Sequence, residues 1–142
     1  MGCLVGLAIV TWNCSRDSVP TVEEQLVGRW EWVQTTTKSG VNAATPSNTG
    51  HTNVIEFDRR GRARFYHDGS LTGAAMFSVR RGVSAKNHRK GHFIIYRGYN
   101  NEQFCSVSGD KLFLEDAGGT KGSHVFFKEA SHRKFATAMN QQ

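Results

Sequence analysis

The sequence predicts an all-β domain, an eight-stranded up-and-down antiparallel β-barrel. Apolar and polar residues alternate through most of the chain after Leu26, which is the period of a half-buried strand. Turn sequences such as Asp68-Gly69 and Ser108-Gly109-Asp110 separate the runs at short intervals. Short strands joined by tight turns favour a closed barrel, because closure leaves no unpaired edge. A two-sheet β-sandwich is the alternative.

The first convincing strand is expected at residues 27–35, after a linker at residues 15–25. Thr21 and Glu24 have the spacing of a capping box, which predicts one helical turn just before the strand. The strand is followed by a Thr-, Ser- and Asn-rich segment at residues 42–51, which we expect to be a loop.

Seven more strands follow in order. Alternation and turn residues predict them at residues 52–58, 62–67, 70–80, 92–97, 103–107, 111–115 and 122–129. Gly61 and Gly69 supply turn positions where a positive φ is needed. The barrel domain therefore spans residues 26–129, and residues 130–142 form a polar tail.

Length and composition restrict the class of protein. The 142 residues make one domain, with nine Phe, three Trp, three Tyr and 15 Gly but only two Pro. The formal net charge of +6 raises the odds of an acidic partner. Cys105 is the single cysteine of the domain, so neither a disulfide framework nor a paired-cysteine metal site is expected.

Residues 1–14 are expected to be an export signal. The stretch is apolar and turns polar after Cys14, and a cysteine at such a break is typical of bacterial lipoproteins. We therefore expect lipidation at Cys14 and a membrane-anchored envelope protein. Plain secretion to the periplasm or outside, or an uncleaved leader, are the alternatives.

Gly28-x-Trp30, preceded by Leu26, opens the first strand, and Val107-Ser108-Gly109-Asp110 forms a late hairpin. These features resemble the lipocalin superfamily, and more closely the small lipocalin-like domains of bacterial envelope proteins. The resemblance covers roughly residues 26–128. It implies that Trp30 plugs the closed end of the barrel, with a basic residue of the last strand stacked on it. Lys128 is the candidate, where an Arg is usual.

An eight-stranded barrel has room for inward side chains or one small ligand. The expected function is binding of a small hydrophobic molecule, with a fully packed barrel acting through its basic surface as the alternative. The candidate ligand-binding residues are apolar side chains on successive strands: Trp32, Phe57, Phe65, Phe77, Tyr96, Cys105 and Phe127. Phe126 and Phe127 belong to a continuous apolar run, so the inward member of that pair is ambiguous.

No catalytic residues, metal ligands or cofactor are expected. The six histidines have no metal-ligand spacing in the sequence, and no phosphate loop or nucleophile elbow is present. Arg62 and Arg64 are expected on the outer face, where few aromatic residues accompany them, so nucleic-acid binding is not expected. The chain is expected to act as a monomer and not as an enzyme.

Overall fold

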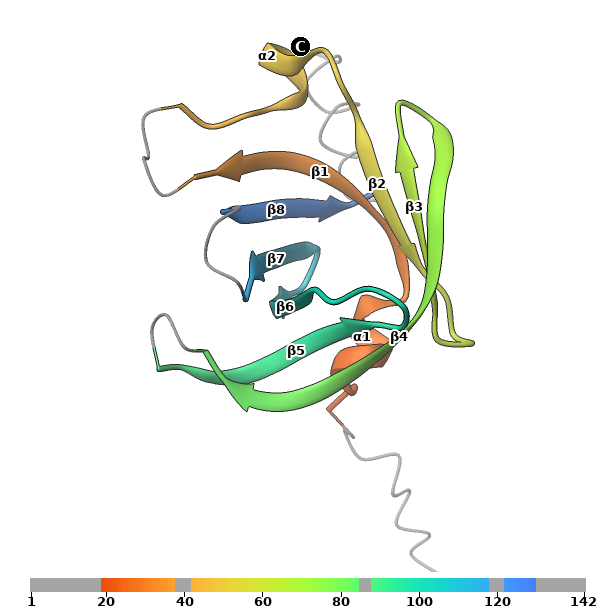
Figure 1. The fold of residues 1–142 in the computed structure, drawn as a ribbon, viewed down its shortest axis with the longest axis vertical. Helices are drawn as coiled ribbons and strands as arrows, with labels where there is room; N and C mark the ends of the chain where they lie inside the picture. Colours follow the sequence, from red (N-terminus) through yellow and green to blue (C-terminus); the bar gives the residue numbers. More distant parts are fainter. Residues whose placement is uncertain (1–18, 38–41, 85–87, 118–121, 130–142) are drawn as a thin grey trace, which may run out of the picture.

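The computed structural model describes residues 19–37, 42–84, 88–117 and 122–129. Eight strands form one closed antiparallel barrel, in which each strand pairs with its neighbours in the sequence and the last pairs with the first (Figure 1). The strands are β1 (Gly28–Thr36), β2 (Asn53–Phe57), β3 (Arg62–His67), β4 (Ser70–Val83), β5 (Lys90–Tyr96), β6 (Glu102–Ser108), β7 (Lys111–Asp116) and β8 (Ser123–Lys128). The predicted up-and-down barrel is confirmed and the sandwich is excluded. The predicted leader with Cys14 and the polar tail lie outside the described residues.

Strand β4 is the longest element because its two neighbours pair with different halves of it. Its first half pairs with β3 and its second half, from Phe77, pairs with β5. The strand continues to Val83, three residues past the predicted end at residue 80. This one strand therefore connects the β3 side of the barrel to the β5 side.

Two short helices accompany the barrel among the described residues. The predicted capping box precedes α1 (Val22–Leu26), which lies against β4 and β6. A second helix, α2 (Pro46–Thr49), lies in the segment predicted as a loop, with Thr45 as its N-cap and Gly50 in the left-handed conformation at its end. The prediction missed it because the polar composition of the segment favoured a loop. Within the described ranges, no helix is long and apolar enough to cross a membrane.

The end of the barrel beside α1 is closed by Trp30. Its side chain is fully buried, and its indole Nε1–H donates a 2.7 Å hydrogen bond to the carbonyl of Leu26. The ammonium of Lys128 lies 5.4 Å from the centre of the indole ring. Gly28 has φ 135°, and a Cβ there would lie 2.9 Å from Cε of Lys128. The Gly-x-Trp sequence thus permits the lysine stem to pass over the start of β1.

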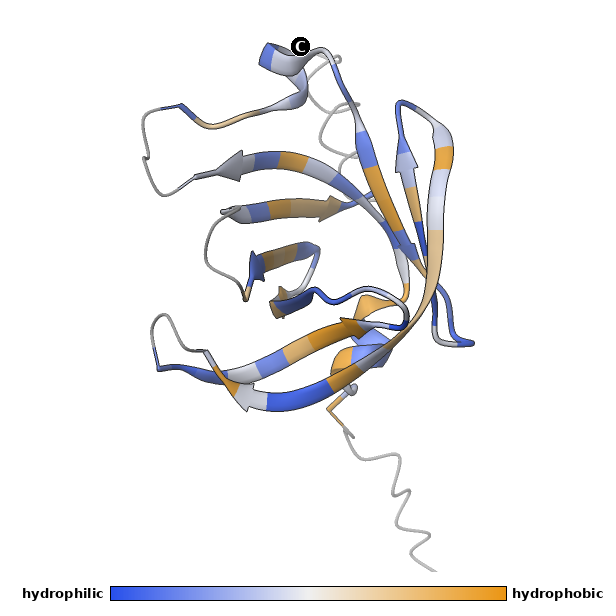
Figure 2. Ribbon diagram, viewed as in Figure 1, coloured by the Kyte–Doolittle hydropathy of each residue, from blue (hydrophilic) through white to orange (hydrophobic). Residues whose placement is uncertain are grey.

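The alternation of the sequence places one face of each strand inside the barrel, as the banding of hydropathy in Figure 2 illustrates. The core combines residues from β1 to β8 with Leu26 of α1: Trp30, Ile55, Phe57, Ala63, Ala75, Ile94, Tyr96, Cys105, Leu112, Leu114 and Phe126. Burial of these side chains supplies the main driving force for closure.

Two aromatic residues on the outer face explain a break in the alternation. Phe93 and Phe104 are cross-strand neighbours, with ring centres 5.4 Å apart in an edge-to-face arrangement. Their rings lie over Gly82 and Gly91, where a Cβ would approach within 2.7 and 2.4 Å of them. Because Gly82 and Gly91 have no side chain, the two rings can be buried on the outer face of the barrel. Both faces of β5 therefore carry buried apolar residues, which explains the continuous apolar run in its sequence.

Candidate functional site

A cavity of about 320 Å³ opens at the end of the barrel opposite Trp30. The residues that line it come from six strands and the β5–β6 turn: Ile55, Phe65, Tyr96, Tyr99, Asn101, Gln103, Leu114, His124 and Phe126. We call this space the mouth cavity. Its floor is the top of the hydrophobic core, since Ile55, Leu114 and Phe126 are buried there.

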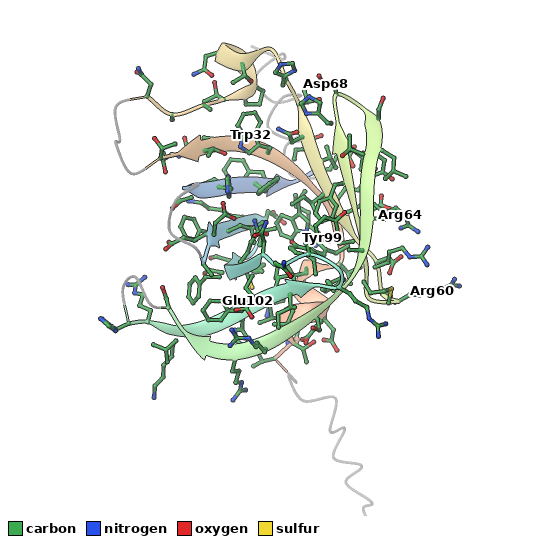
Figure 3. The ribbon with its side chains drawn as sticks, viewed as in Figure 1. Trp32, Arg60, Arg64, Asp68, Tyr99 and Glu102 are labelled. Atoms are coloured by element: carbon green, nitrogen blue, oxygen red, sulfur yellow. The ribbon has the colours of Figure 1, made fainter. Side chains whose placement is uncertain are left out.

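One wall of the mouth cavity is aromatic. The ring of Phe65 makes edge-to-face contacts with Tyr96 and Tyr99, at 5.3 and 6.5 Å between ring centres. A Cβ on Gly73 would lie 3.3 Å from the Tyr99 hydroxyl, so the absence of a side chain there leaves space for the tyrosine. Tyr99 is 50% exposed and forms the rim, where it is labelled in Figure 3.

The opposite wall is polar and continuously hydrogen-bonded. The hydroxyl of Tyr96 donates to Oε1 of Gln103 at 3.1 Å, and Nε2 of Gln103 donates to Oδ1 of Asp116 at 2.9 Å. The other carboxylate oxygen of Asp116 lies 3.2 Å from Nε2 of His124. Asp116 therefore accepts hydrogen bonds from both sides and anchors the chain of side chains.

The polar chain continues onto β1 through Thr35. Its hydroxyl lies 2.8 Å from Nδ1 of His124 and accepts a 2.8 Å hydrogen bond from Nε1–H of Trp32. When the neutral imidazole donates from Nε2 to Asp116, its Nδ1 accepts a hydrogen bond from the Thr35 hydroxyl. In the imidazolium, both ring nitrogens donate. Every contact is satisfied in either state of His124.

A β-bulge brings Trp32 and Thr35 to the same face. The β1–β8 register shifts between Trp32 and Gln34, so that Trp32 pairs with Phe126 and Thr35 with His124. Without the extra residue, strict alternation would turn Thr35 outward. The bulge is thus the local feature that completes the polar wall.

Burial is the main cause that raises the pKa of the Tyr96 phenol, with smaller contributions from the charges of Cys105 and Asp116. The phenol therefore remains protonated at physiological pH and acts as a donor to Gln103. Tyr99 and Asn101 differ from it, because their polar side-chain atoms have no hydrogen-bond partner among the described residues.

The predicted ligand-binding residues divide into three groups. Phe65 and Tyr96 line the mouth cavity. Trp32 (labelled in Figure 3) does not line it, but its indole N–H donates a hydrogen bond to Thr35 of the polar wall. Phe57, Phe77 and Cys105 lie outside it, in or against the packed core. Phe127 pairs with Glu31 and Lys111, on the face opposite Phe126, so its predicted inward position is wrong. Phe126 takes that place.

Cys105 is a core residue. Burial raises the pKa of its thiol to about 12, with a smaller contribution from Glu23. The thiolate is the reactive form of cysteine, so this side chain behaves as a small apolar group near neutral pH.

Sequence reasoning missed the polar wall. Thr35 and His124 are 89 positions apart, and Gln103 and Asp116 are 13 apart with no motif spacing. The one usable signal was a polar residue at an inward position of β6, β7 and β8. Among the described residues that line the cavity, His124 alone has a usual metal-ligand side chain, and Asp116 is bonded to it; catalytic zinc sites use three ligands.

A larger space of about 900 Å³ lies between α1 and the strands β5, β6 and β7. It is lined by side chains of both faces of β6, such as Cys105 and Ser106, because the β5–β6 pairing ends at His92. Its rim carries Lys90 and Lys111. This space is a surface groove where two strands separate.

Two arginines of the basic outer face are paired with neighbouring acids. Arg29 makes ion pairs with Glu56 and Glu129, and Arg64 makes ion pairs with Glu56 and Asp58. The guanidinium of Arg29 also lies 5.0 Å from the centre of the Tyr66 ring, the aromatic residue that accompanies the Arg62–Arg64 pair.

Comparisons with protein-family models, with curated proteins and with solved structures found no significant match.

Proposed function

We propose that this protein is a lipocalin-like carrier or sensor that binds one small, mainly apolar molecule in the mouth cavity. The observation that carries the proposal is a single space with an aromatic wall, an apolar floor and a polar wall of fixed geometry. Binding sites for small molecules generally combine such apolar surfaces with a few placed polar groups.

The volume limits the size of the ligand. The mouth cavity of about 320 Å³ would hold roughly ten waters at liquid density and lies at the low end of ligand sites. A single or fused ring system fits this space. A long-chain fatty acid or a haem-like compound would extend far beyond the rim at Tyr99.

The polar wall would orient the ligand. Gln103 has a second amide proton beyond its bond to Asp116, and His124 lies at the cavity surface. Tyr99 and Asn101 add polar atoms at the rim. A hydroxyl or carbonyl on one edge of the ring system would find partners on this side, while its apolar edge contacts Phe65.

The polar wall supports binding better than catalysis. Asp116, His124 and Thr35 follow the order of a hydrolase triad, but Thr35 is absent from the cavity lining and its oxygen already accepts a hydrogen bond from the Trp32 indole N–H. A nucleophile needs access to the substrate and nearby oxyanion donors. The same contacts serve instead to hold His124 in one orientation.

The alternative function through a basic surface has less support. Two of the arginines on that surface, Arg29 and Arg64, are held by acidic neighbours, and Tyr66 lies under Arg29. Stacking of a nucleobase would first have to displace these contacts.

We propose further that the barrel works in the cell envelope, anchored by a lipid on Cys14. The described chain begins at Val19 and enters α1 beside the closed end of the barrel (Figure 1). The mouth cavity lies at the opposite end. Cys14→Ala should move the protein from the membrane fraction to the soluble fraction in its bacterial host. Unchanged fractionation would contradict the anchor.

Titration with 2-naphthol, naphthalene and palmitate tests the binding proposal. We expect saturable one-to-one binding of 2-naphthol, weaker binding of naphthalene because it lacks the hydroxyl, and no binding of palmitate inside the barrel. Tyr99→Ala should weaken 2-naphthol binding, whereas Tyr66→Ala, a matched tyrosine on the outer face, should not. Equal effects of the two substitutions, or no saturable binding, would contradict the proposal.

A further inference from the structure

We propose that His51, His67 and Asp68 form a binding site for a divalent transition-metal ion of the zinc class. Each side chain offers one ligand atom, and the three atoms lie within 4.8 Å of one another. The site lies outside the mouth cavity and does not depend on the proposed ligand-binding function.

The distances from the Asp68 carboxylate to the two histidines are near those of a metal-bound site. Nδ1 of His51 lies 2.8 Å from Oδ2 of Asp68, and Nε2 of His67 lies 3.3 Å from the same oxygen. Zinc bonds to nitrogen and oxygen of about 2.0–2.1 Å in a tetrahedron place neighbouring ligand atoms about 3.3–3.4 Å apart. Metal binding would require the His51–Asp68 pair to separate by about half an ångström on that geometry.

The backbone gathers these residues from two segments. His51 follows α2, while His67 ends β3 and Asp68 opens the hairpin to β4, at the tip labelled in Figure 3. Asp68 has φ 49°, a left-handed conformation that the turn imposes and that Asp tolerates better than most residues. The two histidine rings lie 5.0 Å apart between centres, so both can face one ion.

Second contacts fix the orientation of two of the three ligands. Oδ1 of Asp68 accepts the backbone N–H of Thr52 at 2.8 Å, which leaves Oδ2 turned toward the histidines. Nδ1 of His67 lies 2.8 Å from Oδ1 of Asn53, which leaves Nε2 as the ligand atom. Metal-binding histidines commonly use their second nitrogen in this way.

The exposure and the chemistry of the three side chains also suit a cation. All three side chains are exposed, which leaves the remaining coordination positions to water. Two imidazoles and one carboxylate suit Zn²⁺, Co²⁺, Ni²⁺ or Cu²⁺, whereas Ca²⁺ and Mg²⁺ prefer oxygen ligands.

A bound ion would join the segment after α2 to the β3–β4 hairpin. His67 is two residues beyond Phe65, which lines the mouth cavity, so the ion would stiffen one side of its rim. The expectation from the sequence that the chain holds no metal rested on the wide spacing of its histidines. The fold brings His51 within reach of Asp68 across 17 positions.

Calorimetric titration of the full-length protein with Zn²⁺, under reducing conditions, tests this site. We expect one ion per chain, and Co²⁺ should give the visible absorption of nitrogen and oxygen ligands without a thiolate band. His51→Asn and Asp68→Asn should each weaken binding more than tenfold; Asp68→Asn keeps an acceptor for Thr52 and suits the left-handed turn. His88→Asn is the matched control, since His88 is exposed and also has a positive φ of 55°.

Circular dichroism of each variant shows whether the barrel is intact. Loss of Zn²⁺ binding in folded His51→Asn and Asp68→Asn, with His88→Asn unchanged, would establish the site. No uptake by the wild-type chain at 100-fold excess of Zn²⁺, or equal affinity in all variants, would overturn it.

Discussion

Nε2 of His124 lies 3.2 Å from Oδ2 of Asp116, on neighbouring strands at the mouth of the barrel. This pair is the centre of a hydrogen-bonded chain that runs from Tyr96 on β5 to Trp32 on β1. Both side chains are largely buried, at 21% and 18% exposure. The interior of the barrel therefore has a polar side near its opening and an apolar side below it, which is the asymmetry that an oriented small ligand requires.

Phe65 and Phe77 should respond differently to truncation. Phe77 packs edge-to-face on Phe57, with 5.0 Å between ring centres, away from the mouth cavity. Phe77→Ala should lower the free energy of unfolding by about 3–5 kcal/mol without changing 2-naphthol affinity. Phe65→Ala should cost less stability, because it enlarges an existing cavity, and should change the affinity. Urea denaturation and ligand titration on both variants measure this, and equal behaviour would argue for a fully packed barrel.

Cys105 should resist alkylation in the native protein. Burial raises the pKa of its thiol to about 12, so almost no thiolate is present at pH 8. Iodoacetamide followed by peptide mass spectrometry should leave the Cys105 peptide unmodified under native conditions and fully modified in denaturant. Rapid native modification would place the thiol at an accessible site instead of the core.

Trp30 should be the more costly of the two neighbouring tryptophans to replace. Trp30→Phe removes a buried hydrogen bond to Leu26 and leaves a space at the closed end, so we expect a loss of about 2–4 kcal/mol. Trp32→Phe, a matched change on a half-buried ring, should cost less than half as much. Denaturant unfolding monitored by circular dichroism measures both losses, and a reversed order would contradict the closed-end assignment.

Asp58 should give the stability a dependence on acid pH. Backbone N–H groups, first that of Arg62 and then that of Arg60, lower the pKa of its carboxyl below 3.8. A lowered folded-state pKa stabilises the native state above the unfolded pKa, and this contribution disappears as the pH falls through the folded-state value. Asp58→Asn keeps the acceptor but cannot ionise, so unfolding midpoints between pH 5 and pH 2 should fall less steeply than in the wild type. An identical slope would show that Asp58 contributes nothing.

The order of strands was predictable because its signals are local. Residues 62–67 were predicted with the observed bounds of β3, since Gly61 and Asp68-Gly69 mark both ends. The Thr21–Glu24 capping box was readable for the same reason. The Thr45–Asn48 capping box and Gly50 had comparable signals, yet the polar composition around them favoured a loop.

The sites were less predictable because they depend on register and closure. Phe126 and Phe127 are equally apolar, and only the pairing of β8 with β1 decides which one faces inward. Thr35 faces His124 because of a bulge that no residue in β1 signals. His51 meets Asp68 through the pairing of β2 with β3, which distant residues determine.

Native mass spectrometry of residues 15–142 from a bacterial host, compared with the organic extract of the same sample, tests the central claim most directly. We expect one small, mainly apolar molecule per chain that is released on denaturation, and whose exchange for 2-naphthol is blocked by Phe65→Trp. A bare mass, together with no uptake of 2-naphthol by the wild-type chain, would contradict a ligand-binding barrel.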